Sequence, residues 1–178
     1  MALFSTRVRY ALRFMVEVHR SSASGSPIAA GAVAAKTGIS VGYLEQLIRP
    51  LAARGLLRGH KGKLGGYRLA RDASAITVGE IVEAVIGTIG VSECTIDASH
   101  CIRSEYCECR LLFRLLSEQL RTTLDAVTLA DMSDVRKLDR VRHDLVGLRD
   151  ARVTSGSPAA PAPAPLPIKE RHARRAQG

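Results

Sequence analysis

Two short helical patterns separated by a glycine turn restrict the possible folds of this chain more than any other feature. The apolar residues of the second pattern recur at the spacing of one helical face: Leu44, Leu47, Ile48 and Leu51. Gly38 interrupts the first pattern, and Ser40 is a suitable N-cap for the second helix. A helix, a glycine-containing turn and a second helix form the layout of a helix-turn-helix.

The surrounding patterns extend this layout to a winged domain. We expect a long helix over residues 5–20 and a short alanine-rich helix over 28–36. Residues 56–59 and 66–70 read as two short strands, and the lysine- and glycine-rich segment between them reads as the tip of a wing. Thr77 and Glu80 then match a capping box, which predicts a helix over 77–86 that Gly87 ends.

The second half of the chain is predicted to contain a cysteine loop over residues 87–109 and a helix from Arg110 to Val127. Six apolar residues form a broad stripe along that helix: Leu112, Phe113, Leu116, Leu120, Leu124 and Val127. A small domain cannot bury such a stripe alone, so we expect a homodimer. Thr128 and Asp131 predict one more cap, followed by a short C-terminal helix.

The predicted fold is therefore mainly α with a small β wing, a winged helix-turn-helix joined to a long dimerisation helix. We divide the chain into residues 1–86 for DNA binding, 87–109 for the cysteine loop and 110–150 for dimerisation. The last segment, residues 151–178, is a Pro/Ala linker with a basic tail, for which we expect no packed structure.

Charge is unevenly distributed along the chain. Residues 1–71 hold twelve Lys/Arg against two acids, whereas residues 72–150 hold nine against fourteen. A segment this basic favours a polyanionic partner, and double-stranded DNA is the usual one. The acidic middle of the chain is not expected to touch DNA.

The winged helix-turn-helix layout predicts which residues would contact DNA. The exposed start of the second helix would meet base edges, with Gln46 able to pair with adenine and Glu45 with a cytosine amine. The wing and the first helix would reach phosphates or the minor groove. The full candidate set is Arg7, Arg9, Ser40, Tyr43, Glu45, Gln46, Arg49, Lys61, Lys63, Gly65, Gly66 and Tyr67.

All four cysteines lie within sixteen residues, at Cys94, Cys101, Cys107 and Cys109. Clustering on one polar loop favours an iron–sulfur cluster, whose normal ligands are thiolates. Zinc is an alternative, although its usual motif has two CxxC-like pairs. A metal-free switch that forms a disulfide is another, and four inert thiols remain possible.

Several quoted segments together resemble the Rrf family of winged-helix regulators, with IscR- and NsrR-like members. They are VRYALRFMVEV, ISVGYLEQLIRPLAARGLL, GGYRLARDASAITVGEIVEAV and the three spaced cysteines before a long helix, over about residues 1–135. The resemblance implies a dimeric regulator that holds a [2Fe–2S] or [4Fe–4S] cluster through Cys94, Cys101 and Cys107. It also implies a palindromic operator, and we expect a repressor that senses iron, oxygen, nitric oxide or redox state.

The sequence departs from that pattern at the fourth ligand. Arg110 stands where IscR-type members place a histidine, and Arg9 stands where NsrR-type members place a carboxylate. Cys109 is the natural local substitute, with His100, Glu105 and Glu108 behind it. The first two cysteines are also separated by six residues rather than five.

Other classes of function are less consistent with the sequence. No catalytic triad, phosphate loop or paired-carboxylate pattern is present, so we do not expect an enzyme. A thiol oxidoreductase would normally carry CxxC at a helix start, and an electron carrier would not need the basic segment. No signal peptide or membrane-spanning run is evident, so a cytoplasmic protein is expected.

Overall fold

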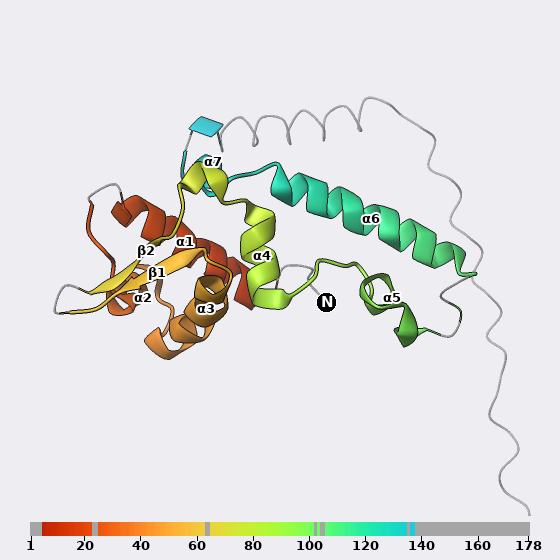
Figure 1. The fold of residues 1–178 in the computed structure, drawn as a ribbon, viewed down its shortest axis with the longest axis horizontal. Coiled ribbons are helices and arrows are strands. Elements are labelled where there is room, and N and C mark those ends of the chain that lie inside the picture. The colour runs from red at the N-terminus through yellow and green to blue at the C-terminus, as the bar shows by residue number, and fades with distance from the viewer. Residues whose placement is uncertain are drawn as a thin grey trace, which may run out of the picture. The chain divides into compact units, whose positions relative to one another are not determined.

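The computed structural model describes residues 5–22, 25–62, 65–101, 103, 106–134 and 136–137. Its helices are α1 (Thr6–Ser22), α2 (Ala30–Thr37), α3 (Val41–Ala53), α4 (Val78–Ile86), α5 (Glu93–Ile96), α6 (Glu108–Asp125) and α7 (Leu129–Ser133), with 3₁₀ turns η1 (Ala73–Ala75) and η2 (Ala98–His100). The strands β1 (Leu57–His60) and β2 (Gly66–Leu69) form one antiparallel sheet. The protein is mainly helical with a small β wing, as predicted (Figure 1).

Three helix-end signals predicted in the first half, at Gly38, Ser40 and Thr77, are present in the structure. Gly38 ends α2 in the left-handed conformation, with φ 72°, and its N–H bonds the Ala34 carbonyl. Ser40 caps α3 and accepts a hydrogen bond from the Tyr43 N–H at 3.4 Å. The capping box between Thr77 and Glu80 is present at the start of α4. The N-caps Ser40 and Thr77 accept from backbone N–H groups that a helix start leaves unpaired, and Gly38 donates to a carbonyl at a helix end, so these residues fix where the helices begin and end.

One prediction about α2 is wrong. The helix begins at Ala30 rather than at residue 28, because Ile28 pairs with the wing instead. The Ile28 N–H bonds the Tyr67 carbonyl at 3.0 Å, and the Tyr67 N–H bonds the Ile28 carbonyl at 2.8 Å. Ile28 thus forms an isolated antiparallel bridge with β2 and extends the two-stranded wing by a single residue.

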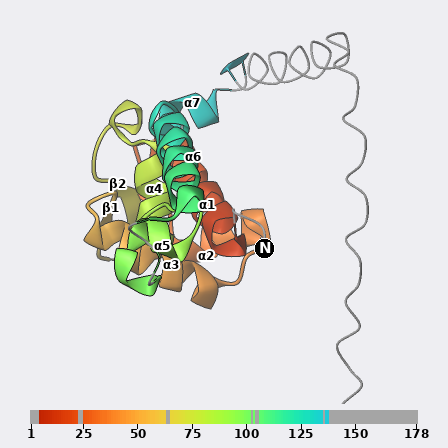
Figure 2. The same ribbon diagram turned by 90° about the vertical axis from the view of Figure 1, so that its right-hand side faces the viewer.

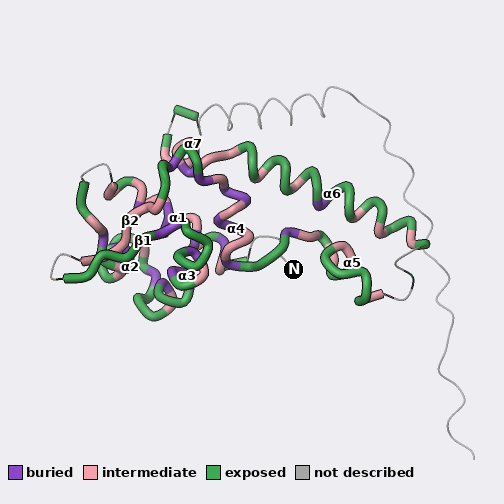
Figure 3. The backbone as a smooth tube through the Cα atoms, in the orientation of Figure 1, coloured by how far each residue is buried: buried purple, intermediate pink, exposed green. Residues whose placement is uncertain are grey.

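The core lies between α1, α3 and α4. Val8, Phe14 and Met15 of α1 are fully buried, as are the central residues of α3 and α4 (Figure 3). Burying a leucine- or phenylalanine-sized side chain is worth about 1.5–3 kcal/mol. The four core residues of α3 therefore hold the helix in one rotational setting, with its polar side outward.

Residues before α4 pair with residues after α6 and so close the segment between them. Thr77 and Thr128 form an isolated antiparallel bridge. The Val78 N–H bonds the Val127 carbonyl, and the Leu129 N–H bonds the Ile76 carbonyl, both at 2.8 Å. The segment containing α4, the cysteine loop and α6 therefore starts and ends at the same place.

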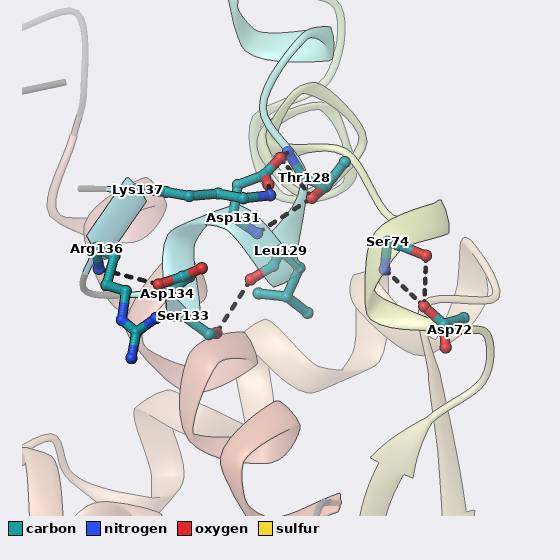
Figure 4. A network of polar contacts seen from close by, with 9 residues as sticks. All are labelled: Asp72, Ser74, Thr128, Leu129, Asp131, Ser133, Asp134, Arg136 and Lys137. Carbon is teal, nitrogen blue, oxygen red and sulfur yellow. Dashed lines mark hydrogen bonds and ion pairs between the residues drawn. The ribbon is translucent and has the colours of Figure 1, made fainter. Parts of the chain in front are cut away.

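The short helix α7 is fixed at that junction by the cap predicted from Thr128 and Asp131. Thr128 accepts from the Asp131 N–H at 3.1 Å, and the Asp131 carboxylate accepts from the Thr128 N–H at 3.0 Å (Figure 4). Lys137 also donates to this carboxylate. Hydrogen bonds from Lys137 and then from Thr128 hold the pKa of Asp131 well below its usual range. The Leu129 side chain is fully buried in the core.

Candidate DNA-binding surface and cysteine loop

The predicted contacts on α3 share one exposed side of that helix. Glu45, Gln46 and Arg49 are exposed, as is the cap residue Ser40, whereas the apolar residues of α3 face the core. Side chains at these positions can reach a groove without disturbing the packing of the helix. The arrangement suits base-edge and phosphate contacts by the start of a recognition helix.

Tyr43 is less available than the sequence implied. It is half-buried, and its ring packs edge-on against Tyr10 of α1, with the ring centroids 5.7 Å apart. An edge-to-face pair of this kind contributes about 0.5–1.5 kcal/mol beyond area burial. Tyr43 therefore helps to seat α3 on α1.

The wing is attached to α1 by a similar pair. The Tyr67 ring of β2 packs against the buried ring of Phe14, with centroids 6.3 Å apart. α1 thus carries one aromatic contact for the recognition helix and another for the wing. Lys61 is exposed at the wing tip, and the candidate Lys63 lies outside the described residues.

The two wing glycines predicted to approach DNA have structural reasons of their own. A Cβ on Gly65 would lie 2.5 Å from the His60 carbonyl oxygen. A Cβ on Gly66 would overlap the Ile28 carbonyl oxygen and lie 2.8 Å from the Ala29 nitrogen. Only glycine fits where backbone approaches backbone this closely.

Sequence reasoning missed a pair of arginines on the wing. The strand register places Arg58 opposite Arg68. Arg58 is exposed, while Arg68 is half-buried and donates to the Gly25 carbonyl. Like charges directly opposite on a sheet are unfavourable unless an anion offsets them. The predicted strand bounds pair Gly59 with Gly66 and so place Arg58 opposite Tyr67, whereas in the structure His60 pairs with Gly66 and the register moves by one residue.

The basic residues at the start of α1 differ in exposure. Arg9 is exposed, and its guanidinium donates to the Thr6 hydroxyl at 3.1 Å. Arg7 is half-buried, and its Nε is buried without a hydrogen-bond partner. Arg9 remains the more accessible phosphate candidate of the two.

The cysteine loop contains more local structure than expected. Cys94 lies in α5, Cys101 follows η2, and Cys107 is the N-cap residue of α6. α6 begins at Glu108 rather than Arg110, so Cys109 lies in the first turn of the helix and not in the loop. All four thiols are free; Cys109 is exposed and the other three are partly buried.

The start of this loop is fastened to α6, which runs beside it (Figures 1 and 2). The Val91 N–H donates to the Ser117 hydroxyl at 3.0 Å. Arg110 donates through Nε to the Cys94 carbonyl at 2.9 Å. The Ser92 hydroxyl and the Cys94 sulfur are 3.4 Å apart.

The other candidates for a fourth ligand, His100, Glu105 and Glu108, differ in their surroundings. His100 Nδ1 lies 3.4 Å from the Asp97 carboxylate, an ion pair when the histidine is protonated. The Ser99 backbone N–H and hydroxyl lower the pKa of that carboxylate. Glu108 is exposed, and Glu105 lies outside the described residues.

The four thiols suit an iron–sulfur cluster by ligand type. Among the residues that the structure describes, however, no three Cys, His, Asp or Glu side chains form a group that could hold a metal ion.

The apolar stripe predicted on α6 separates into two faces. Phe113, Leu120 and Leu124 are partly buried; the two leucines pack on the core of their own domain, and the buried Ser117 lies on the same side. A second face consists of four exposed leucines: Leu111, Leu112, Leu115 and Leu116. Figure 3 shows α6 exposed along most of its length.

No described helix is both long and apolar enough to cross a membrane.

Comparison with known proteins agrees with this architecture. The family profile "Rrf2: Iron-dependent Transcriptional regulator" matches residues 4–135. A putative HTH-type transcriptional regulator of Azotobacter vinelandii, ORF2, is 34% identical over 157 residues, covering 86% of this chain and 90% of the relative. The regulator IscR of Klebsiella pneumoniae (strain 342) is 35% identical over 128 residues, covering 72% and 77% respectively.

Solved structures lead to the same family. CymR, described as the global cysteine regulator of B. subtilis, superposes with a TM-score of 0.63 at 31% identity, covering 75% of this chain and 97% of that one. IscR of T. potens gives 0.58 at 25% identity, with coverage of 86% and 90%. The oxidized form of Staphylococcus aureus CymR gives 0.57 at 28% identity, with coverage of 75% and 97%. These relatives are transcriptional regulators rather than enzymes, and this chain belongs to the Rrf2 family of DNA-binding, winged-helix transcriptional regulators.

Proposed function

We propose that this regulator controls its DNA binding through an iron–sulfur cluster held by Cys94, Cys101 and Cys107. The observation that carries the proposal is the placement of every cysteine of the chain, unpaired, between the end of α4 and the first turn of α6. This segment leads directly from the DNA-binding domain to the long helix. The iron-dependent character of the matching family supports iron as the signal.

The cluster, when bound, supplies a centre whose stability depends on iron, oxygen or nitric oxide. The chain's own residues supply the thiolates, and contacts of the loop with α6 fix the positions of two of the cysteines before a cluster binds. Cys94 is held through its carbonyl by Arg110, and Cys107 is fixed at the cap of α6. Cys109, exposed in the first helical turn, is the fourth thiol available as a ligand.

DNA recognition is assigned to α3, the wing and the start of α1. Glu45 and Gln46 would meet base edges, while Arg9, Arg58 and Lys61 would contact phosphates, with Lys63 of the wing as a further candidate. The exposed positions of the described residues support these roles. Their combined charge should make affinity fall steeply with salt.

The exposed leucine face of α6 supports a homodimer. Leu111 and Leu115 are 70% and 58% exposed, and one turn of helix separates them. Exposed leucines in adjacent turns are costly in water and suit a second helix of the same kind. A two-fold dimer would read a palindromic operator, and we assign it the role of a repressor.

A thiol switch is the second candidate. It requires only two of the four free thiols to come together. The similarity to an oxidized form of S. aureus CymR also supports it. In this case two cysteines would form a disulfide when an oxidant such as a peroxide accepts the two electrons.

The deciding experiment is anaerobic purification with a visible absorption spectrum and analysis of iron, sulfide and zinc. Iron, acid-labile sulfide and bands between roughly 300 and 450 nm are expected for thiolate-bound clusters. Cys94→Ala should abolish these bands, whereas Ser99→Ala, also in the loop, should keep them. A colourless wild-type protein whose operator affinity changes only with peroxide would replace the cluster with the thiol switch.

A further inference from the structure

The first part of the cysteine loop is bound to α6 by two side chains of that helix, Ser117 and Arg110. Ser117 accepts the Val91 N–H at 3.0 Å and donates its own proton to the Phe113 carbonyl at 2.7 Å. Arg110 donates to the Cys94 carbonyl at 2.9 Å. The bonds to Val91 and Cys94 each join a side chain of the helix to the backbone of the loop.

The two contacts lie on one face of α6. Arg110 and Ser117 are seven residues apart, which is two helical turns, or about 10 Å along the axis. Val91 and Cys94 are three residues apart and lie where the chain turns into α5. The segment between them is therefore held to α6 at both ends.

Burial indicates that these bonds matter. Ser117 is 8% exposed and is the buried polar side chain among the described residues. A buried hydroxyl is stable only when its hydrogen bonds are made, and here it has one acceptor and one donor as partners. A Cβ on the neighbouring Gly90 would lie 2.5 Å from Ile96 Cγ1 and 2.9 Å from Thr95 Oγ1, so α5 folds back tightly on this point.

The chemistry of Arg110 suits attachment rather than ligation. A guanidinium has only donors and stays protonated, so it cannot bind iron as a histidine does. It can hold a carbonyl, and the structure shows it doing so at the residue that carries the first candidate ligand. The position is therefore occupied by a residue that restrains the loop.

We propose that Arg110 and Ser117 are positioning residues that couple the state of Cys94 to α6. The inference rests on the proposed function, because it requires that the thiols change state. With both bonds in place, a movement of Cys94 displaces α6 together with the loop. Without them, the loop rearranges alone and the DNA-binding domain receives less of the change.

The test compares operator affinity of the cluster-loaded protein with that of the same protein after iron removal by a chelator. The measured quantity is the ratio of the two dissociation constants. Arg110→Met and Ser117→Ala should each bring this ratio about five-fold closer to one, the change expected from one hydrogen bond of ordinary strength. Arg110→Lys, which keeps the charge and a donor, should restore part of the ratio.

Two variants on α6 serve as matched controls. Arg114→Met removes an exposed arginine one turn further along, and Thr123→Ala removes a hydroxyl that bonds only its own helix, at Gln119. Both should keep the wild-type ratio. Independently of iron, amide exchange of Val91 in the metal-free protein should be slow in the wild type and fast in Ser117→Ala.

The outcomes separate the two proposals. If wild-type affinity depends on iron and both variants keep the full ratio, the coupling role is refuted and the sensing function stands. If Val91 exchanges equally fast in the wild type and in Ser117→Ala, the contact itself is refuted. If wild-type affinity is the same with and without iron and with and without peroxide, the sensing function fails and the coupling role fails with it.

Discussion

Gly66→Ala should destabilise the wing because no room exists for a side chain at this position. The new Cβ would overlap the Ile28 carbonyl oxygen and lie 2.5 Å from the Ile28 carbonyl carbon. These are backbone atoms of a residue whose own side chain is only 6% exposed, so they cannot move aside cheaply. Relief requires the wing to separate from Ile28.

The cost follows from the bonds that separation would break. Ile28 and Tyr67 exchange two backbone hydrogen bonds, at 3.0 and 2.8 Å. Each contributes about 0.5–1.5 kcal/mol, so the loss should be about 1–3 kcal/mol. The range agrees with the usual cost of overpacking a well-filled site.

The assay is urea unfolding followed by circular dichroism, with Gly59→Ala as the matched control. Gly59 lies in the other strand of the same wing, and its added Cβ would meet only Tyr67 Cε1, at 3.9 Å. The control should change the free energy of unfolding by less than about 0.5 kcal/mol. Equal stability of the two variants would refute the argument, because it would show that the wing does not need Ile28.

Three further predictions concern other parts of the chain. Thr128→Ala should lower the free energy of unfolding by about 1 kcal/mol in urea titrations, because it removes the cap of α7; no loss would contradict the capping box. Because the folded-state pKa of Asp131 is lowered, its stabilisation is present above about pH 4 and is lost as pH falls through that lowered pKa. Asp131→Asn should therefore unfold with a weaker dependence on acid pH than the wild type. Leu115→Arg should yield monomers in sedimentation, whereas Arg114→Glu, an exposed position on a different side of α6, should not; dimers in both would remove this face from the interface.

Much of the DNA-binding domain could be predicted from sequence because its signals are local. These signals act within a few residues of one another. They are a cap such as Ser40, a terminating glycine such as Gly38 and the four apolar residues on one face of α3. The capping boxes of α4 and α7 were predicted for the same reason. None of these requires knowledge of a distant contact.

The features that escaped prediction depend on tertiary contacts. Ile28 leaves the expected helix because Tyr67, distant in sequence, offers it two hydrogen bonds. The sequence predicts a single apolar stripe on α6, because periodicity alone cannot tell which leucines meet the chain's own core. The loop contacts of Arg110 and Ser117 have no sequence signal, because neither residue type is unusual on a helix.

The bridge between Thr77 and Thr128 holds together the two ends of the segment between them, which is about fifty residues long and so forms a closed ring. The entropy of closing such a ring grows only with the logarithm of its length. One additional residue in a ring this large costs on the order of a few hundredths of a kcal/mol. Within the ring, Arg110 holds Cys94 and Cys107 is the N-cap of α6, so this freedom belongs to the segment between those two residues, where one additional residue still costs only about 0.1 kcal/mol.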